Sequence, residues 1–236
     1  MGVRGTVMSP RRVALVACGA LLLTGVAGCA SETEVRTQKG SEATIVPTER
    51  AKVPEGWTVY RGPGFTVAVP PDWKPKPDDQ RVAPQAALEV GLPYTGQSAS
   101  PPVLLAFVER ERVGPLVYRE PILRAQFEAG LPGVTLGDSK HVTVAGSTDA
   151  VTFDALYQDE GGESVLGTRL EPTTFRNREL IVETPGLPKY GFRYGASKDQ
   201  FDEATWEKIL GSIVVTTGGG DPVAEDPAAP AETTGG

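Results

Sequence analysis

The single histidine of this sequence, His141, lies in GDSKHVTVAG beside Asp138 and Ser139. Serine, histidine and aspartate are the components of a nucleophilic triad, in which the histidine accepts the proton of the attacking hydroxyl. Groups that are adjacent in sequence rarely converge in this way, however. A strand that begins here would place His141 on the side opposite Val142 and Val144, because side chains alternate along a strand. We therefore expect His141 to face solvent, and we assign no catalytic residue.

Two clusters of charged residues could bind ions. Asp159, Glu160 and Glu163 flank Gly161-Gly162, where several oxygens on one loop could hold calcium weakly. A solvated acidic turn is the simpler interpretation. Arginines in neighbouring predicted strands could form an anion-binding face, although glutamates in the same strands favour paired charges instead (Arg169, Arg176, Arg178, Arg193; Glu171, Glu179, Glu183). The sequence predicts no metal site and no cofactor.

Two aromatic residues are candidates for a binding surface. Tyr94 lies in GLPYTGQSAS, a stretch rich in Gly, Pro and Ser, where a large side chain has little packing to gain. Tyrosine is also favoured in interfaces. Trp73 follows Pro70-Pro71-Asp72, at the end of a predicted hairpin where packing against the first strands is the simpler interpretation. A partly exposed tyrosine without a role is the alternative for Tyr94.

The N-terminus has the features of an export signal. Arg4, Arg11 and Arg12 precede an apolar run over 13–27; at roughly fifteen residues it is too short for the ~20 that span a bilayer. The run ends in Val26-Ala27-Gly28-Cys29, which resembles a bacterial lipobox. In such precursors the cysteine sulfur receives a diacylglyceryl group and a peptidase cuts just before it. We predict lipidation of Cys29 and a mature chain that begins there, with export by either the Sec or the twin-arginine route.

A second motif competes for surface attachment. LPYTG, at 92–96, matches the Leu-Pro-x-Thr-Gly pattern at which a sortase joins proteins to the cell wall. A working sorting signal lies near the C-terminus, before an apolar stretch and a basic tail. Here the motif lies between two predicted strands, and the sequence ends in TTGGGDPVAEDPAAPAETTGG. We therefore predict that Cys29 is the anchor.

Cleavage before Cys29 would change the net charge of the chain. The removed segment holds three arginines and no acidic residue, so 20 basic and 30 acidic residues remain, a net charge of −10. This charge opposes binding to nucleic acid and electrostatic adhesion to anionic lipid. Cys18 leaves with the signal, and an acylated Cys29 cannot form a disulfide or act as a thiol nucleophile.

Composition divides the chain into four parts. Residues 1–28 form the signal peptide, and 29–54 form the lipidated cysteine and a polar, flexible tether. As a flexible chain, residues 30–54 would span about 25–30 Å on average. Residues 55–216 have the size of one globular domain. Residues 217–236, rich in acidic residues, Gly, Pro and Ala, form a disordered tail.

Apolar residues within 55–216 recur at strand spacing in some segments and at helix spacing in others. WTVYRGPGFTVAVPPDW alternates apolar and polar residues around 61–64, which predicts a hairpin. Pro121 opens a predicted helix with Ile122, Leu123, Phe127 and Leu131 on one side. Ser197 and Gln200 form a predicted capping box for a last helix with Phe201, Trp206, Ile209, Leu210 and Ile213 on one side. Strands interrupted by two helices predict a single α+β domain with an antiparallel β-sheet flanked by helices.

Three segments carry a resemblance to a known family: GFTVAVPPDW, DAVTFDALYQ and YGFRYGASKDQFDEATWEKILGSIVV. They resemble the PsbP-like family of α/β/α sandwiches, and more closely its actinobacterial lipoprotein branch, the LpqN type. The resemblance covers roughly 55–216 and rests on structural motifs. It implies an antiparallel sheet covered by helices, no common active site, and a role in binding or assembly. It implies no ligand residues.

These observations predict a lipoprotein on the outer face of the cytoplasmic membrane, held there through acylated Cys29. We expect a monomeric, non-catalytic binding or assembly module of the cell envelope, with an envelope protein as partner, and not an enzyme. The alternative is a carrier or receptor for a small apolar or glycolipid ligand, which would need an apolar pocket between sheet and helices.

Overall fold

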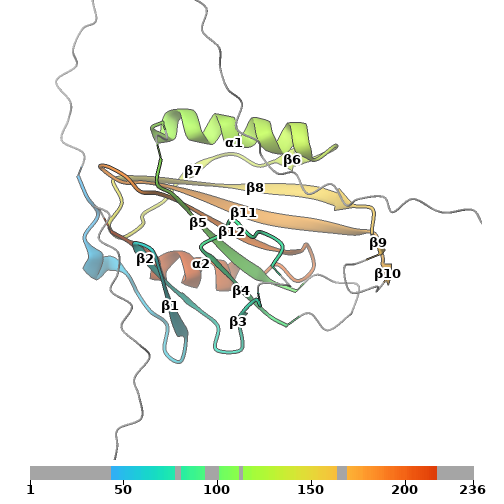
Figure 1. The fold of residues 1–236 in the computed structure, drawn as a ribbon, viewed down its shortest axis with the longest axis horizontal. Coiled ribbons are helices and arrows are strands. Elements are labelled where there is room, and N and C mark those ends of the chain that lie inside the picture. The colour runs from blue at the N-terminus through green and yellow to red at the C-terminus, as the bar shows by residue number, and fades with distance from the viewer. Residues whose placement is uncertain (1–43, 78–80, 94–100, 112–113, 164–168, 217–236) are drawn as a thin grey trace, which may run out of the picture. The chain divides into compact units, whose positions relative to one another are not determined.

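A computed structural model describes residues 44–77, 81–93, 101–111, 114–163 and 169–216. These residues form an α+β arrangement of antiparallel sheets and two helices in a single domain, which confirms the predicted fold class (Figure 1). Before the first strand, a short 3-10 helix, η1, covers Thr48–Arg50. The backbone of Val46 hydrogen-bonds to Gly146 and Ser147, and the N–H of Lys52 donates to the carbonyl of Gly211. Part of the segment predicted as tether therefore contacts the domain.

The main sheet has its longest strands at the centre. Its order is β3-β4-β5-β12-β11-β8-β6, with β7 also paired to β8, and all of these pairings are antiparallel. The strands are β3 (Lys74–Pro75), β4 (Leu88–Gly91), β5 (Val103–Glu109), β6 (Thr135–Leu136), β7 (Lys140–His141), β8 (Asp149–Asp159), β11 (Thr173–Glu183) and β12 (Lys189–Ser197). A separate pair joins β9 (Gly162–Glu163) to β10 (Arg169–Leu170).

The predicted hairpin is confirmed. Strands β1 (Thr58–Gly62) and β2 (Phe65–Val69) pair antiparallel, with Gly62 opposite Phe65. The turn requires glycine at Gly64, whose φ is +79°. Strand β13 (Val214–Val215) adds to β2 and completes a three-stranded second sheet.

Helix α1 (Leu116–Gly130) covers one face of the main sheet and begins five residues before the predicted start. Pro121 lies inside the helix rather than at its first turn. Its ring removes one backbone hydrogen bond there, so packing must outweigh that loss. Phe127 is buried against Phe153 and Ile181, with Leu123 and Leu131 packed beside them. Ile122, predicted to share that stripe, is instead exposed.

Helix α2 (Glu203–Ser212) covers the opposite face, together with the second sheet. The predicted capping box is wrong. Ser197 ends β12, and its carbonyl accepts a hydrogen bond from the N–H of Gln200. Asp202 is the N-cap, and its carboxylate accepts from the N–H groups of Ala204 at 3.1 Å and Thr205 at 3.2 Å. A carboxylate at this position satisfies two amides that have no partner within the helix.

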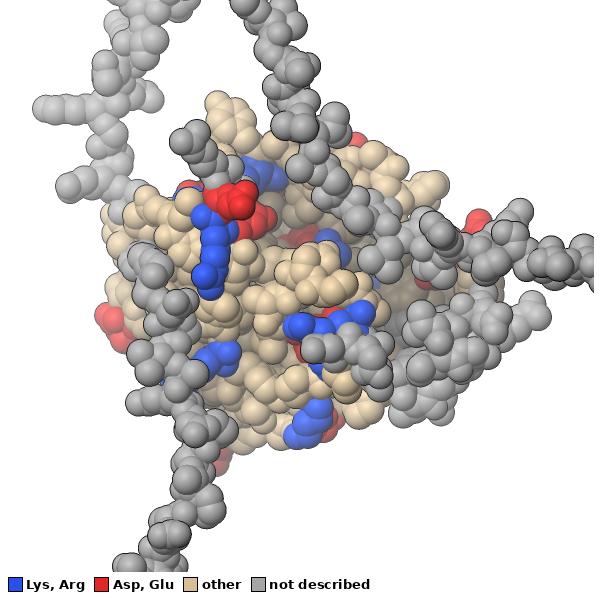
Figure 2. Space-filling view, in the orientation of Figure 1, with Lys and Arg blue, Asp and Glu red and all other residues tan. Residues whose placement is uncertain are grey.

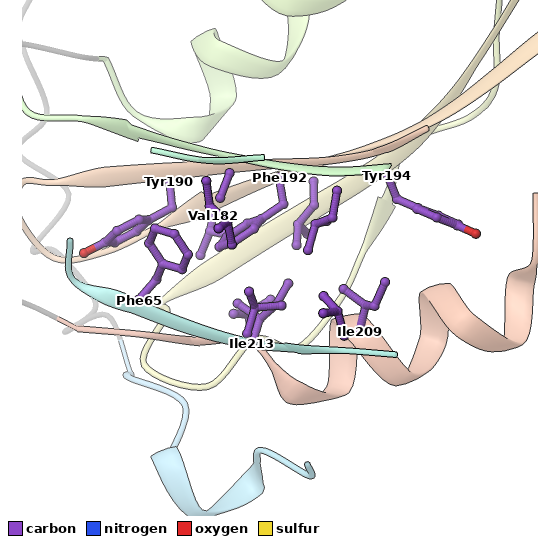
Figure 3. Packing of buried hydrophobic residues seen from close by; sticks show 14 of the residues in the cluster. Phe65, Val182, Tyr190, Phe192, Tyr194, Ile209 and Ile213 are labelled. Atoms are coloured by element: carbon purple, nitrogen blue, oxygen red, sulfur yellow. The ribbon is translucent and has the colours of Figure 1, made fainter. Parts of the chain in front are cut away.

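The larger core lies between the main sheet and the α2 layer (Figure 3). Alternate residues of β12, namely Tyr190, Phe192 and Tyr194, point into it. Phe65 packs edge-on against Phe192 with ring centroids 5.4 Å apart, and Trp206 stacks on Tyr194 at 6.1 Å. Aromatic side chains bury large areas, and edge-to-face pairs add to that stabilisation.

Replacing Gly146 with alanine should destabilise the domain strongly. Gly146 has a φ of +84°, and an added Cβ would lie 1.7 Å from the carbonyl oxygen of Val215. We expect a loss of about 3 kcal/mol or more in the free energy of unfolding, because backbone strain and a backbone clash combine. Urea unfolding of the purified chain would measure it.

Gly133→Ala is the matched control. Gly133 has a φ of +75° but nothing within 4 Å of an added Cβ, so only the strain applies, about 1 kcal/mol. Equal losses in the two variants would contradict the close approach of Gly146 to β13.

Candidate functional site

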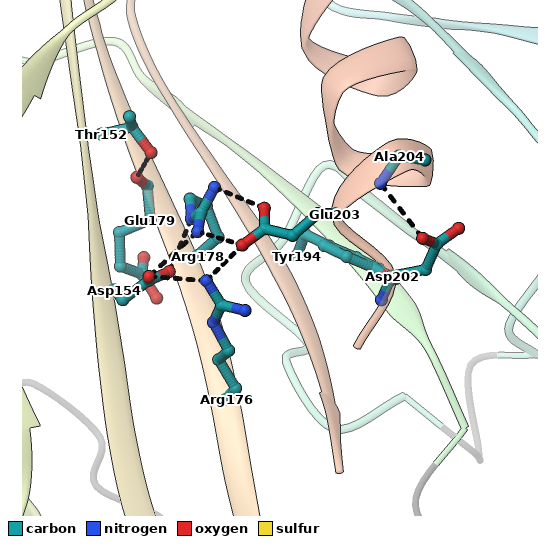
Figure 4. A network of polar contacts seen from close by, with 9 residues as sticks. All are labelled: Thr152, Asp154, Arg176, Arg178, Glu179, Tyr194, Asp202, Glu203 and Ala204. Carbon is teal, nitrogen blue, oxygen red and sulfur yellow. Dashed lines mark hydrogen bonds and ion pairs between the residues drawn. The ribbon is translucent and has the colours of Figure 1, made fainter. Parts of the chain in front are cut away.

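Charged side chains gather where the first turn of α2 meets the main sheet. Arg176 and Arg178 lie on β11 and point to the same side, and Asp154 lies opposite Arg178 on β8. The Arg178 guanidinium donates to both carboxylate oxygens of Asp154, at 2.5 and 2.9 Å. It also donates to both oxygens of Glu203 at 3.0 Å. We call Asp154, Arg176, Arg178 and Glu203 the α2 ion-pair cluster (Figure 4).

The α2 ion-pair cluster is balanced in charge. Arg176 also donates to Asp154 at 2.8 Å and to Glu203 at 2.5 Å, and its guanidinium lies 4.1 Å from the ring centre of Phe201. Burial alone raises the pKa of Asp154, but hydrogen bonds and positive charge from Arg178 and Arg176 outweigh it, so the pKa is lowered. The pKa of Glu203 is lowered in the same way. Two arginines and two carboxylates thus fasten α2 to β8 and β11.

The other face of the main sheet carries a second polar group of residues, beside α1. Glu179 on β11 is only 4% exposed and forms an ion pair with Arg193 on β12. Burial raises the pKa of Glu179 although the charge of Arg193 opposes it. The Arg193 guanidinium lies 5.0 Å from the ring centre of Phe127 and 5.9 Å from that of Phe107. A desolvated carboxylate with a specific charged partner is a recognised mark of functional sites.

Aromatic residues continue this face toward one end of the sheet. Tyr157 on β8 lies opposite Phe175 on β11, and their rings stack at 5.5 Å with an interplanar angle of 14°. Burial raises the pKa of Tyr157, while Arg193 and a side-chain hydrogen bond with Asn177 lower it by less. Both rings are half-buried. We define the aromatic–polar face as Phe107, Tyr157, Phe175, Asn177, Glu179 and Arg193.

The aromatic–polar face has the chemistry of a binding surface. Half-exposed rings offer contact area at little conformational cost, and the partly exposed side chain of Arg193 lies on the same face. On the side drawn in Figure 2, basic side chains are scattered singly or beside acidic ones among uncharged surface. Three of the four arginines predicted to share a face are divided: Arg176 and Arg178 point to one side of the sheet, and Arg193 points to the other. The side chain of Arg169 lies outside the described residues.

The structure separates the residues that resembled a triad. His141 is 76% exposed, and its Nδ1 lies 2.8 Å from Oδ1 of Asp149. The hydroxyl of Ser139 donates to Glu120 at 2.5 Å instead. Among the described residues, no group of three or more His, Cys, Asp or Glu side chains is placed to hold a metal ion.

The predicted binding residues have different positions. Trp73 is 3% exposed and packs in the core, stacked on Tyr194 at 6.0 Å, so its contacts are those of a packing residue. Tyr94 and Cys29, the predicted lipidation site, lie outside the described residues. The loop that contains Tyr94 leaves β4 and returns to β5 at Val103, which pairs with Gly195, and Gly195 pairs with Asn177. That loop therefore starts and ends at the end of the sheet that carries the aromatic–polar face.

Sequence reasoning did not find the aromatic–polar face. Its residues come from β5, β8, β11 and β12, and the register between strands brings them together. One signal was present in TTFRNRELIVE: Phe175, Asn177 and Glu179 alternate with residues that point to the other side.

No family model and no curated protein matches this chain. The chain is similar to a solved structure of LpqN from Mycobacterium tuberculosis, described as involved in cell envelope biogenesis, with 18% identity and a TM-score of 0.45 over 68% of this chain and 91% of that one. A Pseudomonas aeruginosa protein of unknown function matches with 15% identity and a TM-score of 0.44, over 69% and 99% of the two chains. A Bacteroides thetaiotaomicron protein matches with 13% identity and a TM-score of 0.42 over 70% of this chain, which spans 49% of that protein's length. Within the described ranges, no helix is both long and apolar enough to cross a bilayer.

Asp154→Asn should destabilise the domain at neutral pH and much less in acid. The lowered pKa of Asp154 means that its carboxylate stabilises the folded state fully above its unfolded pKa of 3.8, and that this stabilisation is lost as the pH falls through the folded pKa. We expect a cost of about 2 kcal/mol at pH 7, because Arg178 loses a charged partner in a partly buried site. Urea unfolding at several pH values would measure it.

Asp149→Asn on the same strand is the control. Asp149 pairs with the exposed His141, so the cost at pH 7 should stay below about 1 kcal/mol. A cost for Asp154→Asn that did not shrink in acid would contradict the assigned role of its charge.

Proposed function

We propose that this protein is a lipid-anchored, extracytoplasmic binding module of the cell envelope, without catalytic activity. The lipobox that ends at Cys29 supports the anchor, which would hold the protein on the outer face of the cytoplasmic membrane. The aromatic–polar face is the observation that carries the binding role. It combines the stacked rings of Tyr157 and Phe175 with the Glu179–Arg193 pair on one side of a rigid sheet.

Pairing of the charged groups supports binding rather than catalysis. A catalytic acid or base must reach a reacting group with its proton. Glu179 is buried beneath the surface and held by Arg193, and the α2 ion-pair cluster binds its carboxylates to two arginines. These groups hold side chains in place, which suits a preorganised surface that keeps its shape when a partner binds.

An envelope protein is the partner that we propose for this face. Aromatic and arginine side chains are the residues that contribute most to protein–protein contacts. The alternative partner is a glycolipid or another small ligand. The stacked rings favour it specifically, since flat sugar faces pack on aromatic rings and the partly exposed Arg193 lies on the same face of the sheet.

Cys29→Ser should release the protein from the membrane fraction and abolish its labelling with a palmitate analogue. The acylated sulfur is the only anchor in the proposal, so its loss leaves a chain with a net charge of −10 and no lipid. Fractionation of cells and metabolic labelling would show this. Cys18→Ser is the matched control and should change neither result, because Cys18 leaves with the signal. Membrane retention of the Cys29→Ser variant would refute the lipoprotein assignment.

A photo-crosslinking residue in place of Phe175 should capture one recurrent envelope protein in living cells. Benzoylphenylalanine keeps an aromatic ring at this half-buried position, so the fold should persist. The same residue at Val59, an exposed position on β1 in the second sheet, should not capture that protein. Mass spectrometry of the crosslinked products would decide between the partners. Recovery of lipid or glycan alone at Phe175 would favour the carrier function. Identical products at both positions would contradict a site on the aromatic–polar face.

A further inference from the structure

Helix α1 exposes several large apolar residues on the side that faces away from the sheet. Val117, Tyr118 and Ile122 are 68%, 64% and 57% exposed, and they supply three of the eight large exposed hydrophobic side chains among the described residues. Pro121 and Ala125 lie exposed between and beyond them. We call these five residues the outer stripe of α1. A helix on the surface of a soluble domain normally presents polar residues to water here.

Charged residues of the first three turns of α1 point away from the outer stripe. Arg119 is buried and donates to Glu109 at 3.1 Å and to the carbonyl of Val182 at 3.2 Å. Glu120 and Arg124 pair with each other at 3.5 Å. These contacts fix the rotation of the helix about its axis, so the apolar side must face outward.

The chain enters the domain at the same end of the main sheet at which α1 begins. The N–H of Val46 donates to the carbonyl of Ser147, and the N–H of Thr148 donates to the carbonyl of Glu183. The carboxylate of Glu183 lies 3.8 Å from the Arg119 guanidinium in the first turns of α1. Figure 1 shows the first described residues and the start of α1 at one end of the sheet. The first described residues therefore meet the domain at the end of the main sheet at which the outer stripe begins.

We propose that the outer stripe of α1 rests on the bilayer surface to which Cys29 is anchored. This inference depends on the proposed lipid anchor. With the flexible tether predicted from the sequence, residues 29–43 would span about 20 Å on average, which is less than the width of the domain. Such a tether keeps the domain beside the membrane, so a contact too weak to bind alone is made intramolecular and is favoured.

Three features favour a lipid surface over a protein as the occupant. The outer stripe is small, whereas a stable protein interface uses roughly 20–30 residues on each side. The five residues of the stripe carry no charge, and Glu128, the exposed acidic residue of α1, follows one turn beyond Ala125 near the end of the helix. Tyr118, with an apolar ring and a polar hydroxyl, is the kind of side chain that is enriched at membrane interfaces.

Fluorescence from a single introduced thiol tests this contact in the full lipidated protein. The mature chain has only Cys29, whose sulfur is acylated, so Ile122→Cys provides one site for a polarity-sensitive dye. Glu207→Cys is the control, since Glu207 is exposed on α2, on the other face of the sheet. Both proteins are reconstituted in vesicles of phosphatidylethanolamine and phosphatidylglycerol, with or without lipids that carry a doxyl quencher. Flotation of the vesicles verifies anchorage.

We expect a blue shift of the dye at position 122 and quenching by doxyl lipid that is at least about twofold stronger than at position 207. Equal quenching at the two positions in protein that floats with the vesicles would overturn the inference and leave the anchor intact. A blue shift without doxyl quenching would identify a protein, such as a second copy, as the occupant and would also overturn it. Failure to float would overturn both the anchor and this inference.

Discussion

Pairing of β11 with β8 on one side and with β12 on the other is the constraint on which the rest of the structure depends. The β8–β11 ladder runs from Thr173 opposite Asp159 to Glu183 opposite Asp149, and β12 continues it on the other side. Apolar side chains of these strands point to both faces of the sheet, so each face must be covered. Helix α2 and the second sheet cover one face, and α1 covers part of the other. The remainder carries the half-buried Tyr157, Phe175 and Arg193 of the aromatic–polar face.

Local sequence patterns predicted the elements that depend on neighbouring residues. The hairpin at 58–69 follows from alternation and from a glycine at the turn, and the α+β class follows from the mixture of periods. The sequence patterns gave wrong predictions where contacts between residues far apart in the chain determine the structure. The sequence pattern predicts Pro121 as the start of a helix. The buried contacts of Leu116 and Arg119 instead extend α1 to five residues before it. Ser197 and Gln200 read as a cap, yet β12 needs Ser197 as its last paired residue, opposite Phe175.

The candidate site was less predictable than the fold for the same reason. The charged residues of β11 were visible in the sequence, but their partners were not. Arg178 meets Asp154 and Arg193 meets Glu179 only because of the register between strands that lie far apart in the chain. Arg178 and Glu179, adjacent on β11, therefore point to opposite faces of the sheet, and the carboxylates on the two faces differ in environment. Asp154, beside two arginines, is held as a carboxylate, whereas burial raises the pKa of Glu179.

The two sides of the main sheet therefore differ: ion pairs hold α2 in place on one side, and the other side carries the candidate binding surface. On the α2 side, carboxylates with lowered pKa values resist protonation, which keeps α2 attached to the sheet over a wide range of pH. On the α1 side, the polar residues lie among half-buried rings, and the outer stripe of the helix is uncharged. The chain predicted to remain after cleavage before Cys29, with a net charge of −10, would gain little from electrostatic attraction to an anionic surface. Its contacts on this side must then come from apolar area and directed hydrogen bonds, which salt weakens little. Such contacts act only at short range, so they require a device that holds the domain close to its target. A lipid at Cys29 would supply that proximity.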